Sequence, residues 1–305
     1  MLNNDGVETR RLRILLELAR LGSMRAVAEE MHLTTSTVSQ QIAVLAKEVG
    51  ATLIEPDGRR IRLTPAGRRL ADHSVTILAA VDAARLDLRP GAEPAGTVRV
   101  SGFATAIRRS LLPVVAGLRD SHPAVRVCVL EHEPFEQFAL LAGDDIDIAL
   151  TYDYNLAPVT FDPTLEARPL WSAPWSLGVP AGDEHITDFR DHDWIVNSRN
   201  VADETVVRTL ASLAGFTPRI THQADSLTLL QDLIVAGLGV GMLPADQPTH
   251  PGVRLVRLSG PEPRLRAYAV TRRGREGWPP LALVLERLGG GTALPRPGTT
   301  PRRPG

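Results

Sequence analysis

Residues 23–42 read SMRAVAEEMHLTTSTVSQQI, and this stretch contains the signals for two short helices joined by a tight turn. Ser23 is a favourable N-cap for a helix over residues 25–31, and residues 32–34 supply the turn. A longer helix is expected from about Thr35 to Val49, and a further helix with regularly spaced leucines precedes the stretch. A short helix, a turn and a second helix predict a helix-turn-helix.

The helix after the turn has two different faces. Val38, Ile42 and Leu45 are spaced four and then three residues apart, which predicts one buried stripe. At about 100° per residue the opposite side is polar and uncharged, with Ser36, Thr37 and Gln40 at its centre and Ser39 on its flank. Such side chains can bond base edges in the major groove, although a merely solvated helix face has the same pattern. The turn before this helix favours the DNA-reading interpretation.

A basic hairpin follows this helix. Residues 53–63 read LIEPDGRRIRL, where Asp57-Gly58 is a turn signal between two short strands. The hairpin places Arg59, Arg60 and Arg62 beside the predicted helix-turn-helix. In a winged helix such arginines reach phosphates or the minor groove, whereas isolated surface arginines are the simpler alternative.

A long helix is expected from Thr64-Pro65 to about Arg89, because a hydroxyl cap with proline starts helices and Pro90 stops this one. Its apolar and small residues repeat at alternating four and three, as in a coiled-coil seam. The seam consists of Leu70, Ser74, Ile77, Val81, Ala84 and Leu88. The open alternatives are a dimer seam and a helix packed on its own domain.

Predicted strands and helices alternate from Thr97 onward, which predicts an α/β domain with a mainly parallel sheet. Gly237-x-Gly239-x-Gly241 follows a predicted helix, so we interpret it as a helix-to-strand turn and not as a dinucleotide fingerprint, which follows a strand. The only cysteine, Cys128, lies in the predicted strand 125–130 and is expected to be a small buried residue.

The quoted stretch, together with residues 45–67, resembles the signature of LysR-type transcription regulators. Four later segments resemble the effector domain of that family: residues 111–113, 144–150, 168–170 and 235–244. The resemblance extends over roughly residues 7–288. It implies an α/β multidomain protein with an N-terminal winged helix-turn-helix, a long linker helix and a C-terminal two-lobed α/β domain like that of periplasmic binding proteins.

The expected division of the chain follows from these segments. Residues 1–64 form the DNA-binding domain, 65–90 the linker or dimerisation helix, 91–96 a hinge, 97–288 the effector domain and 289–305 a disordered tail. Within the effector domain, residues 97–167 and 259–288 form one subdomain and residues 168–258 the other.

The resemblance implies contacts with double-stranded DNA. The expected DNA-binding residues are Ser23, Arg25, Thr34, Thr35, Ser36, Thr37, Ser39, Gln40, Arg59, Arg60, Arg62 and Thr64. Two positions depart from the family pattern. Thr35 stands where glutamine is common, which implies a different operator preference. Residues 54–56 stand where the family has Phe, a variable residue and Arg, which removes one expected phosphate contact.

Ligands in such two-lobed folds lie at the carboxyl ends of strands and near helix N-termini. The expected effector-binding residues are Phe103, Thr105, Ala106, Thr151, Asn197, Ser198, Arg199 and Ser226, each of which has an ordinary loop role as its alternative. Some relatives have a hydroxyl side chain where this chain has Ala106. This chain therefore lacks one expected hydrogen bond to a ligand carboxylate. We expect a small polar or anionic metabolite.

Composition and charge limit the remaining classes. The net charge is −1, but residues 10–69 have eleven Lys and Arg against six Asp and Glu, as suits a local DNA contact. No signal peptide or membrane span is expected, which predicts a cytoplasmic protein. No nucleophile elbow and no Cys/His metal spacing occur, so we expect no enzyme, cofactor or metal. A solute-binding-like protein or an enzyme built on the two-lobed domain is the alternative. Expected partners are a second copy in a homodimer or homotetramer and RNA polymerase.

Overall fold

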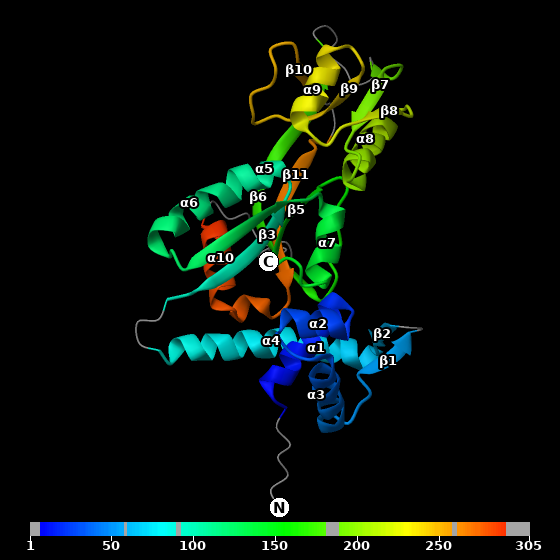
Figure 1. Ribbon diagram of the computed structural model, residues 1–305. Coiled ribbons are helices and arrows are strands. Elements are labelled where there is room, and N and C mark those ends of the chain that lie inside the picture. The colour runs from blue at the N-terminus through cyan, green and yellow to red at the C-terminus, as the bar shows by residue number, and fades with distance from the viewer. Residues whose placement is uncertain (1–6, 58–59, 90–92, 181–188, 258–260, 291–305) are drawn as a thin grey trace, which may run out of the picture.

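The computed structural model describes residues 7–57, 60–89, 93–180, 189–257 and 261–290, which form three stacked units (Figure 1). A helical unit with a small hairpin lies at one end, and two lobes of one twisted sheet lie above it. The predicted arginine Arg59, the first two hinge residues and nearly all of the predicted tail lie outside the described residues.

The first unit is the predicted helix-turn-helix. Its helices are α1 (Thr9–Leu21), α2 (Met24–Glu30) and α3 (Thr35–Glu48). Ser23 caps α2, and Thr34 caps α3 by accepting a hydrogen bond from the Thr37 N–H at 3.1 Å. His32 takes a left-handed conformation with φ of 54°, which lets the chain turn sharply between α2 and α3.

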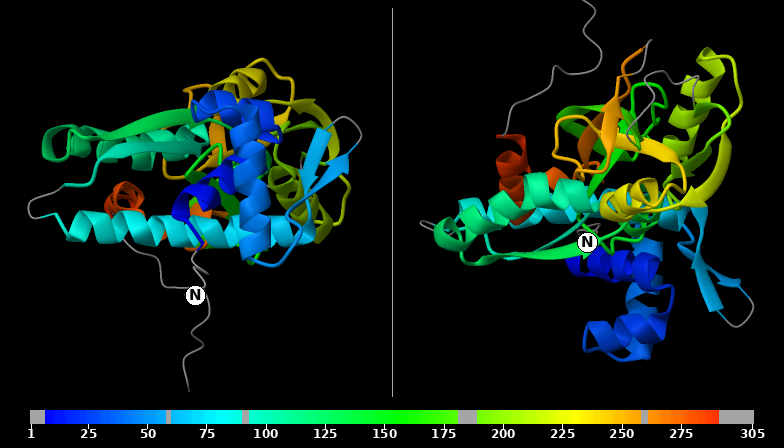
Figure 2. Two further views of the ribbon diagram at one scale, coloured as in Figure 1. Left: turned by 60° about the horizontal axis from the view of Figure 1, so that its bottom comes forward. Right: turned by 90° about the horizontal axis from the view of Figure 1, so that it is seen from above.

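The wing and the linker helix follow. The wing pairs β1 (Ile54–Asp57) with β2 (Arg60–Leu63) in antiparallel register, and α4 spans Pro65–Asp87. The Thr64 hydroxyl accepts from the Gly67 N–H at 3.0 Å and donates to the Thr52 carbonyl oxygen at 2.6 Å. These bonds fix the start of α4 against the loop that precedes the wing, so that α4 extends along the base of the lobes (Figure 2).

Helix α4 packs largely within its own chain. Ala71, Val75 and Leu78 are buried in the same hydrophobic cluster as α1 and α3. Ser74, which we placed in a dimer seam, is fully buried and donates to the Leu70 carbonyl oxygen at 2.7 Å. The exposed side of the helix still presents Ile77, which is 41% exposed.

The lower lobe is an α/β layer directly above α4. Its strands are β3 (Gly96–Gly102), β4 (Val125–Glu131), β5 (Ile148–Tyr154) and β11 (Arg264–Arg272). Its helices are α5 (Ala104–Ala106), a π-helical segment (Ile107–Leu111), α6 (Leu112–Ser121), α7 (Pro134–Ala142) and α10 (Pro279–Gly289). A 3-10 turn, Arg275–Gly277, precedes α10.

The upper lobe has the same kind of layer. Its strands are β7 (Asp193–Val196), β8 (Arg219–Gln223), β9 (Val240–Pro244) and β10 (Arg254–Val256), and its helices are α8 (Val201–Leu213) and α9 (Leu227–Val235). The strand order β4-β3-β5-β11-β6-β9-β7-β8 joins both lobes, with β10 paired to β6.

The lobes are joined by β6 (Leu165–Val179), a single strand of 15 residues. Residues 165–174 pair with β11 in the lower lobe, and residues 175–178 pair with β9 in the upper lobe. The expected subdomain boundary at residue 168 therefore falls inside a continuous strand. The sheet is mixed, because β3, β4 and β5 are parallel, as are β7, β8 and β9, whereas the pairings of β6 and β11 are antiparallel.

Two further sequence expectations have clear outcomes. The turn at residues 237–241 does connect α9 to β9, with Gly237 at φ of 74°. Cys128, expected to be buried, is exposed, because β4 is the edge strand of the sheet and Cys128 lies on its uncovered face. Among the described residues, no helix is both long and apolar enough to cross a membrane.

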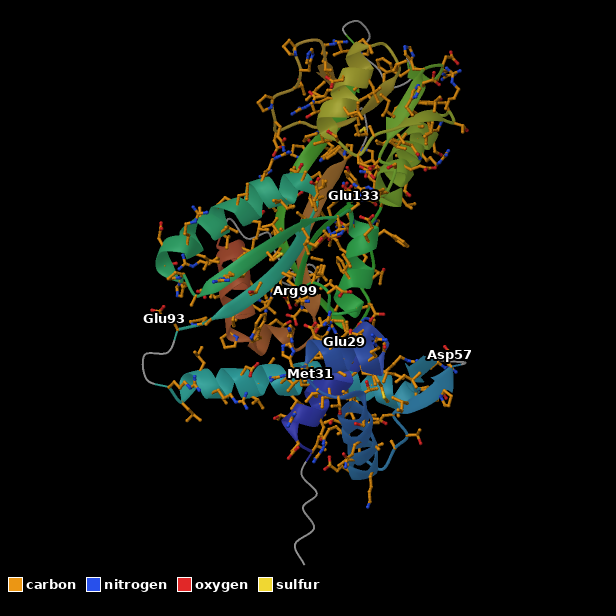
Figure 3. All side chains as sticks on the ribbon, in the orientation of Figure 1. Glu29, Met31, Asp57, Glu93, Arg99 and Glu133 are labelled. Carbon is orange, nitrogen blue, oxygen red and sulfur yellow. The ribbon has the colours of Figure 1, made fainter. Side chains whose placement is uncertain are left out.

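Ion pairs attach the helical unit to the lower lobe. Arg272 of β11 reaches Asp72 of α4 at 2.8 Å, and Arg20 of α1 lies 3.8 Å from Asp145, which precedes β5. The helical unit thus contacts the lower lobe through α1 and α4, and Figure 3 shows Glu29 of α2 on the side nearest that lobe.

Candidate functional site

Helix α3 presents an exposed polar face away from its own core. Val38, Ile42 and Leu45 are each 0% exposed, and Ser36, Ser39 and Gln40 on the other side are exposed. The neighbouring Gln41 is engaged, because its Oε1 accepts from the Arg11 Nε–H at 3.1 Å. Of the two glutamines in α3, Gln40 is therefore the one whose side chain faces solvent.

Hydroxyl groups gather at the N-terminus of α3. The Thr34 Oγ1 atom lies 2.9 Å from Ser36 Oγ and 2.8 Å from Thr37 Oγ1. Thr35 is exposed at the first position of the helix. Helix N-termini carry partial positive charge and unpaired N–H groups, so this end suits a phosphate or a base acceptor.

The other predicted DNA-binding residues differ in how accessible they are. Arg25 is highly exposed and pairs with Glu29 at 2.9 Å, and Arg62 of the wing pairs with Glu55 at 2.9 Å. Arg60 lies in strand β2. Thr64 is only 8% exposed and both of its hydrogen bonds serve the start of α4, so its hydroxyl is committed inside the protein.

A second candidate site is the cleft between the two lobes. A cavity of about 310 Å³ opens where the strands of both lobes end. Five of the predicted effector residues line it: Phe103, Thr105, Asn197, Arg199 and Ser226. Three do not, and each for a visible reason. Ala106 is 0% exposed in the core, Thr151 is 1% exposed within β5, and the Ser198 hydroxyl donates to Asp225 at 2.7 Å.

Aromatic rings form much of the cleft wall. The rings belong to Phe103, Tyr152, Trp171 and Trp175. Phe103 and Tyr152 meet edge to face at a centroid distance of 4.6 Å, and Tyr154 beneath them meets Trp175 at 5.4 Å. Aromatic faces of this kind attract apolar and cationic groups.

The charged residues of the cleft are mainly acidic. Four carboxylates, Glu131, Glu133, Asp203 and Asp225, line it together with two guanidinium groups, Arg108 and Arg199. Arg199 already pairs with Asp225 at 2.8 Å and with Glu136 at 3.4 Å. This balance does not favour the anionic ligand expected from the sequence.

Two carboxyls in the cleft share one tyrosine. The Tyr152 hydroxyl lies 2.9 Å from Asp203 Oδ2 and 3.5 Å from Glu133 Oε2, and the Tyr154 hydroxyl donates to Asp203 Oδ1 at 2.7 Å. Burial, followed by the negative charge of Asp203, raises the pKa of Glu133 to about 7. Burial raises the pKa of Asp203 to about 6.

Sequence reasoning did not identify Glu133, Asp203, Tyr152 or the two tryptophans. A signal existed for the aromatic residues, because Tyr152 and Tyr154 are two apart on β5 and therefore share a face. Asp203 resembles any acidic residue in the first turn of a helix, and Glu133 any residue before one. Nothing local distinguishes them.

Three aspartates near the start of β5, Asp144, Asp145 and Asp147, could suggest a metal site, but Asp147 has another role. Asp147 is 2% exposed and pairs with Arg99 and Arg275, each at 3.2 Å. Its carboxylate therefore joins β3 to the turn before α10. In the part of the chain that the structure describes, no group of three or more His, Cys, Asp or Glu is arranged to hold a metal ion.

Comparisons with known proteins cover both sites. A family model for the bacterial regulatory helix-turn-helix protein of the lysR family matches residues 9–68, and the LysR substrate binding domain matches residues 91–292. Transcriptional dual regulator GltC of Bacillus subtilis is 28% identical over 245 residues, which cover 78% of this chain and 81% of GltC. A hydrogen peroxide-inducible genes activator of Pectobacterium carotovorum is 25% identical over 287 residues, which cover 87% and 90% of the two chains.

Solved structures share the whole arrangement. A full-length OxyR variant from Pseudomonas aeruginosa matches with a TM-score of 0.66 over 94% of this chain and 99% of its own, at 17% identity. Full-length BenM matches with a TM-score of 0.54 over 95% and 100%, at 21% identity. At these identities the likeness shows the fold.

Proposed function

The chain belongs to the LysR family of bacterial helix-turn-helix regulators, and on this premise we propose which of its surfaces perform the two tasks of such a protein. It is a DNA-binding transcription regulator with a C-terminal effector-binding domain. In our proposal α3 reads the operator, and the cleft between the lobes senses a small molecule.

The observation that supports the reading role is the contrast between the two sides of α3. Side chains that are short, polar and exposed lie opposite a stripe that is completely buried. Ser36, Ser39 and Gln40 reach base edges, and Gln40 suits an adenine through its amide. Thr34, Thr35 and Thr37 line the helix N-terminus near the phosphates.

Basic residues around α3 supply attraction that does not depend on sequence. Arg59, Arg60 and Arg62 of the wing and Arg25 of α2 contact phosphates in this proposal, with Ser23 at the start of α2 beside them. Arg25 now pairs with Glu29, and Arg62 pairs with Glu55. On DNA binding each arginine exchanges its glutamate partner for a phosphate. Thr64 is left out, because its hydroxyl is used within the protein.

The test is selection of binding sites from a random duplex library by the full chain. We expect a common motif with two related half-sites, because two copies of α3 in a dimer read DNA with the symmetry of the dimer. Gln40→Ala should weaken binding to the selected motif by about 10- to 100-fold, which corresponds to about 1–3 kcal/mol, and change binding to random DNA little.

Gln223→Ala is the matched control, because Gln223 is an exposed glutamine on β8 of the upper lobe. It should bind the motif like the wild type. If Gln40→Ala weakened binding to motif and random DNA equally, α3 would not read bases and the proposal would fail.

The remaining parts of the proposal follow from the same premise. The protein assembles as a dimer or a tetramer through α4, acts on DNA in the cytoplasm and recruits or blocks RNA polymerase without catalysing a reaction. Residues 1–64, 65–90, 91–96 and 97–288 are its functional divisions. The exposed side of α4, which presents Ile77 and Leu88, supports assembly through this helix.

A further inference from the structure

The charged and aromatic side chains of the cleft indicate the chemical class of its ligand, and this inference rests on the sensing role of the cleft proposed above. We propose that the cleft takes an organic cation, a compound whose protonated amine lies between Glu133 and Asp203 and whose apolar body lies against the aromatic wall. This ligand class differs from the polar or anionic metabolite expected from the sequence.

The first argument is the unbalanced charge of the cleft. Of its two arginines, Arg199 is held by Asp225 and Glu136, and Arg108 is exposed at the mouth. Glu133 and Asp203 have no ion pair with any described residue. Unpaired carboxylates in a largely enclosed site favour a positively charged ligand, because burial strengthens the attraction between charges.

The second argument concerns the single proton of Tyr152. Its hydroxyl can donate to Asp203 or to Glu133 but not to both, and the shorter distance, 2.9 Å against 3.5 Å, favours Asp203. Glu133, which is only 7% exposed, then keeps only the backbone N–H of Glu136 at the start of α7 as a donor to its carboxylate, and no charged donor. A protonated amine has several N–H donors and can satisfy both carboxylates at once.

The third argument is the aromatic wall. Tyr152, Trp175 and Phe103 line the cleft that holds these carboxylates, whereas the face of Trp171 is already covered by the Arg109 guanidinium, 4.4 Å from the ring centroid. Tryptophan and tyrosine faces bind cations, and the attraction is greater when the site excludes water. An acidic centre within an aromatic wall is therefore selective for a cation that carries apolar groups and against a hydrated inorganic ion.

A fourth, independent observation is an unused donor. Trp175 lines the cleft and is 9% exposed, and its Nε1–H has no acceptor among the described residues. A buried donor without a partner costs free energy. A ligand with a hydroxyl or carbonyl oxygen beside its cationic nitrogen would supply the acceptor that this donor lacks.

Proton release should accompany binding. A cation beside Glu133 favours the ionised carboxylate, so binding lowers the pKa of Glu133 from about 7. The other ionisable groups around Glu133 are Glu136 on α7, whose Oε2 accepts from the Glu133 N–H at 3.1 Å, Asp203 on α8, Arg199 before α8, Asp225 before α9, Glu131 and Tyr152. Affinity for an amine should be constant above pH 7 and fall about tenfold per pH unit below it, with Asp203 adding to the fall below pH 6.

The experiment uses the full chain and three matched probes. These are 2-phenylethylamine, 2-phenylethanol and phenylacetate, which differ in charge at one end of the same ring. Calorimetric titration at pH 8 should give at least tenfold tighter binding for the amine than for the alcohol or the carboxylate. Glu133→Gln should remove most of that preference and flatten the pH dependence between pH 6 and 8.

Two further variants separate charge from structure. Glu133→Asp retains a carboxylate and should keep the preference for the amine, even if it binds less tightly. Glu286→Gln removes the same charge from the exposed surface of α10 and should behave like the wild type. Circular dichroism verifies that each variant is folded before it is titrated.

Other outcomes overturn the inference. Tighter binding of phenylacetate, with loss of that binding in Arg199→Gln, would leave the cleft as the sensor but make its ligand an anion. Binding of the amine unchanged by Glu133→Gln would place the cation away from Glu133 and Asp203 and overturn the inference, while the sensing role of the cleft would stand. Failure of all three probes to bind at 10 mM would reject the organic cation.

Discussion

At the scale of single residues, Glu133 shows how a functional carboxyl costs stability. It lies at the top of the lower lobe, facing the upper lobe (Figure 3). Burial and the negative charge of Asp203 oppose its ionisation, and the positive charge of Arg199 offsets them only in part. Its carboxyl is therefore protonated more readily in the folded protein than in the unfolded chain, in which its pKa is near 4.5.

This difference gives a stability prediction. Because the pKa of Glu133 is higher when folded, the folded state loses stability as the pH rises from about 4.5 to about 7. Without ligand, Glu133→Gln should be more stable than the wild type by about 1–3 kcal/mol at pH 8, and the difference should shrink toward pH 5. Urea unfolding followed by tryptophan fluorescence measures it, because all four tryptophans lie in the effector domain.

The surface variant Glu286→Gln provides the control for the loss of one negative charge. It should not alter the dependence of stability on pH. An advantage of Glu133→Gln that is the same at pH 5 and pH 8 would show that ionisation of Glu133 is not its cause.

At the scale of elements, the start of α4 shows how a sequence signal and a close contact act together. The Thr64-Pro65 start was predictable, because capping depends on neighbouring residues only. The reason for Gly67 was not. A Cβ atom at Gly67 would lie 2.1 Å from the Leu53 carbonyl oxygen, which belongs to the chain before the wing. The absence of a side chain allows α4 to begin directly against that backbone.

We therefore expect Gly67→Ala to destabilise the helical unit. The methyl group must displace backbone and not a flexible side chain, and such overpacking costs about 1–3 kcal/mol, or more where backbone cannot move. Thermal unfolding followed by circular dichroism measures the loss. DNA binding should weaken as well, because the wing shifts relative to α3.

Gly117 of α6 is the matched position. A Cβ atom there would meet nothing within 4 Å, so Gly117→Ala should leave stability unchanged or raise it by about 0.5–1 kcal/mol. Similar effects of the two substitutions would mean that loss of glycine flexibility, and not the clash with Leu53, determines the outcome.

At the scale of the whole molecule, two separate cores meet along α4. One hydrophobic cluster extends from Leu12 to Leu78, and the other extends from Val98 to Leu288 through both lobes. Arg272 and Arg20 connect the two parts by ion pairs. Since α4 belongs to the first core and contacts the lower lobe, a movement of the lobes can reach the helix-turn-helix through it.

The exposed side of α4 leads to a prediction about assembly. Ile77 is 41% exposed and Leu88 is 81% exposed, whereas the opposite side of the helix is buried in its own chain. A charge at position 77 should oppose pairing of two such helices. Ile77→Asp should therefore shift the mass in light scattering toward the 33.0 kDa of one chain, compared with at least twice that mass for the wild type.

Leu229→Asp is a suitable control, because Leu229 on α9 is 48% exposed and lies in the upper lobe. It introduces the same charge at a similar exposure and should leave the mass unchanged. A wild-type mass of one chain at micromolar concentration would contradict assembly through α4.

The sequence by itself determined the parts of this protein that depend on neighbouring residues. The helix-turn-helix, the polar face of α3, the cap of α4 and the glycine turn before β9 all follow from caps, turns and periodicity within a few positions. The alternation of strands and helices predicted an α/β domain, and the family resemblance added its two lobes.

Only the tertiary structure decided which residues meet across the chain. It formed one strand, β6, across both lobes, buried Ser74 and exposed Cys128 on an edge strand. It also brought the carboxylates of Glu133 and Asp203, which are 70 residues apart in the sequence, to the hydroxyl group of Tyr152. The charge of the cleft is set by residues that are far apart in the sequence and close together in the fold. No local pattern encodes it, because each carboxylate looks like an ordinary helix-end residue until the lobes come together.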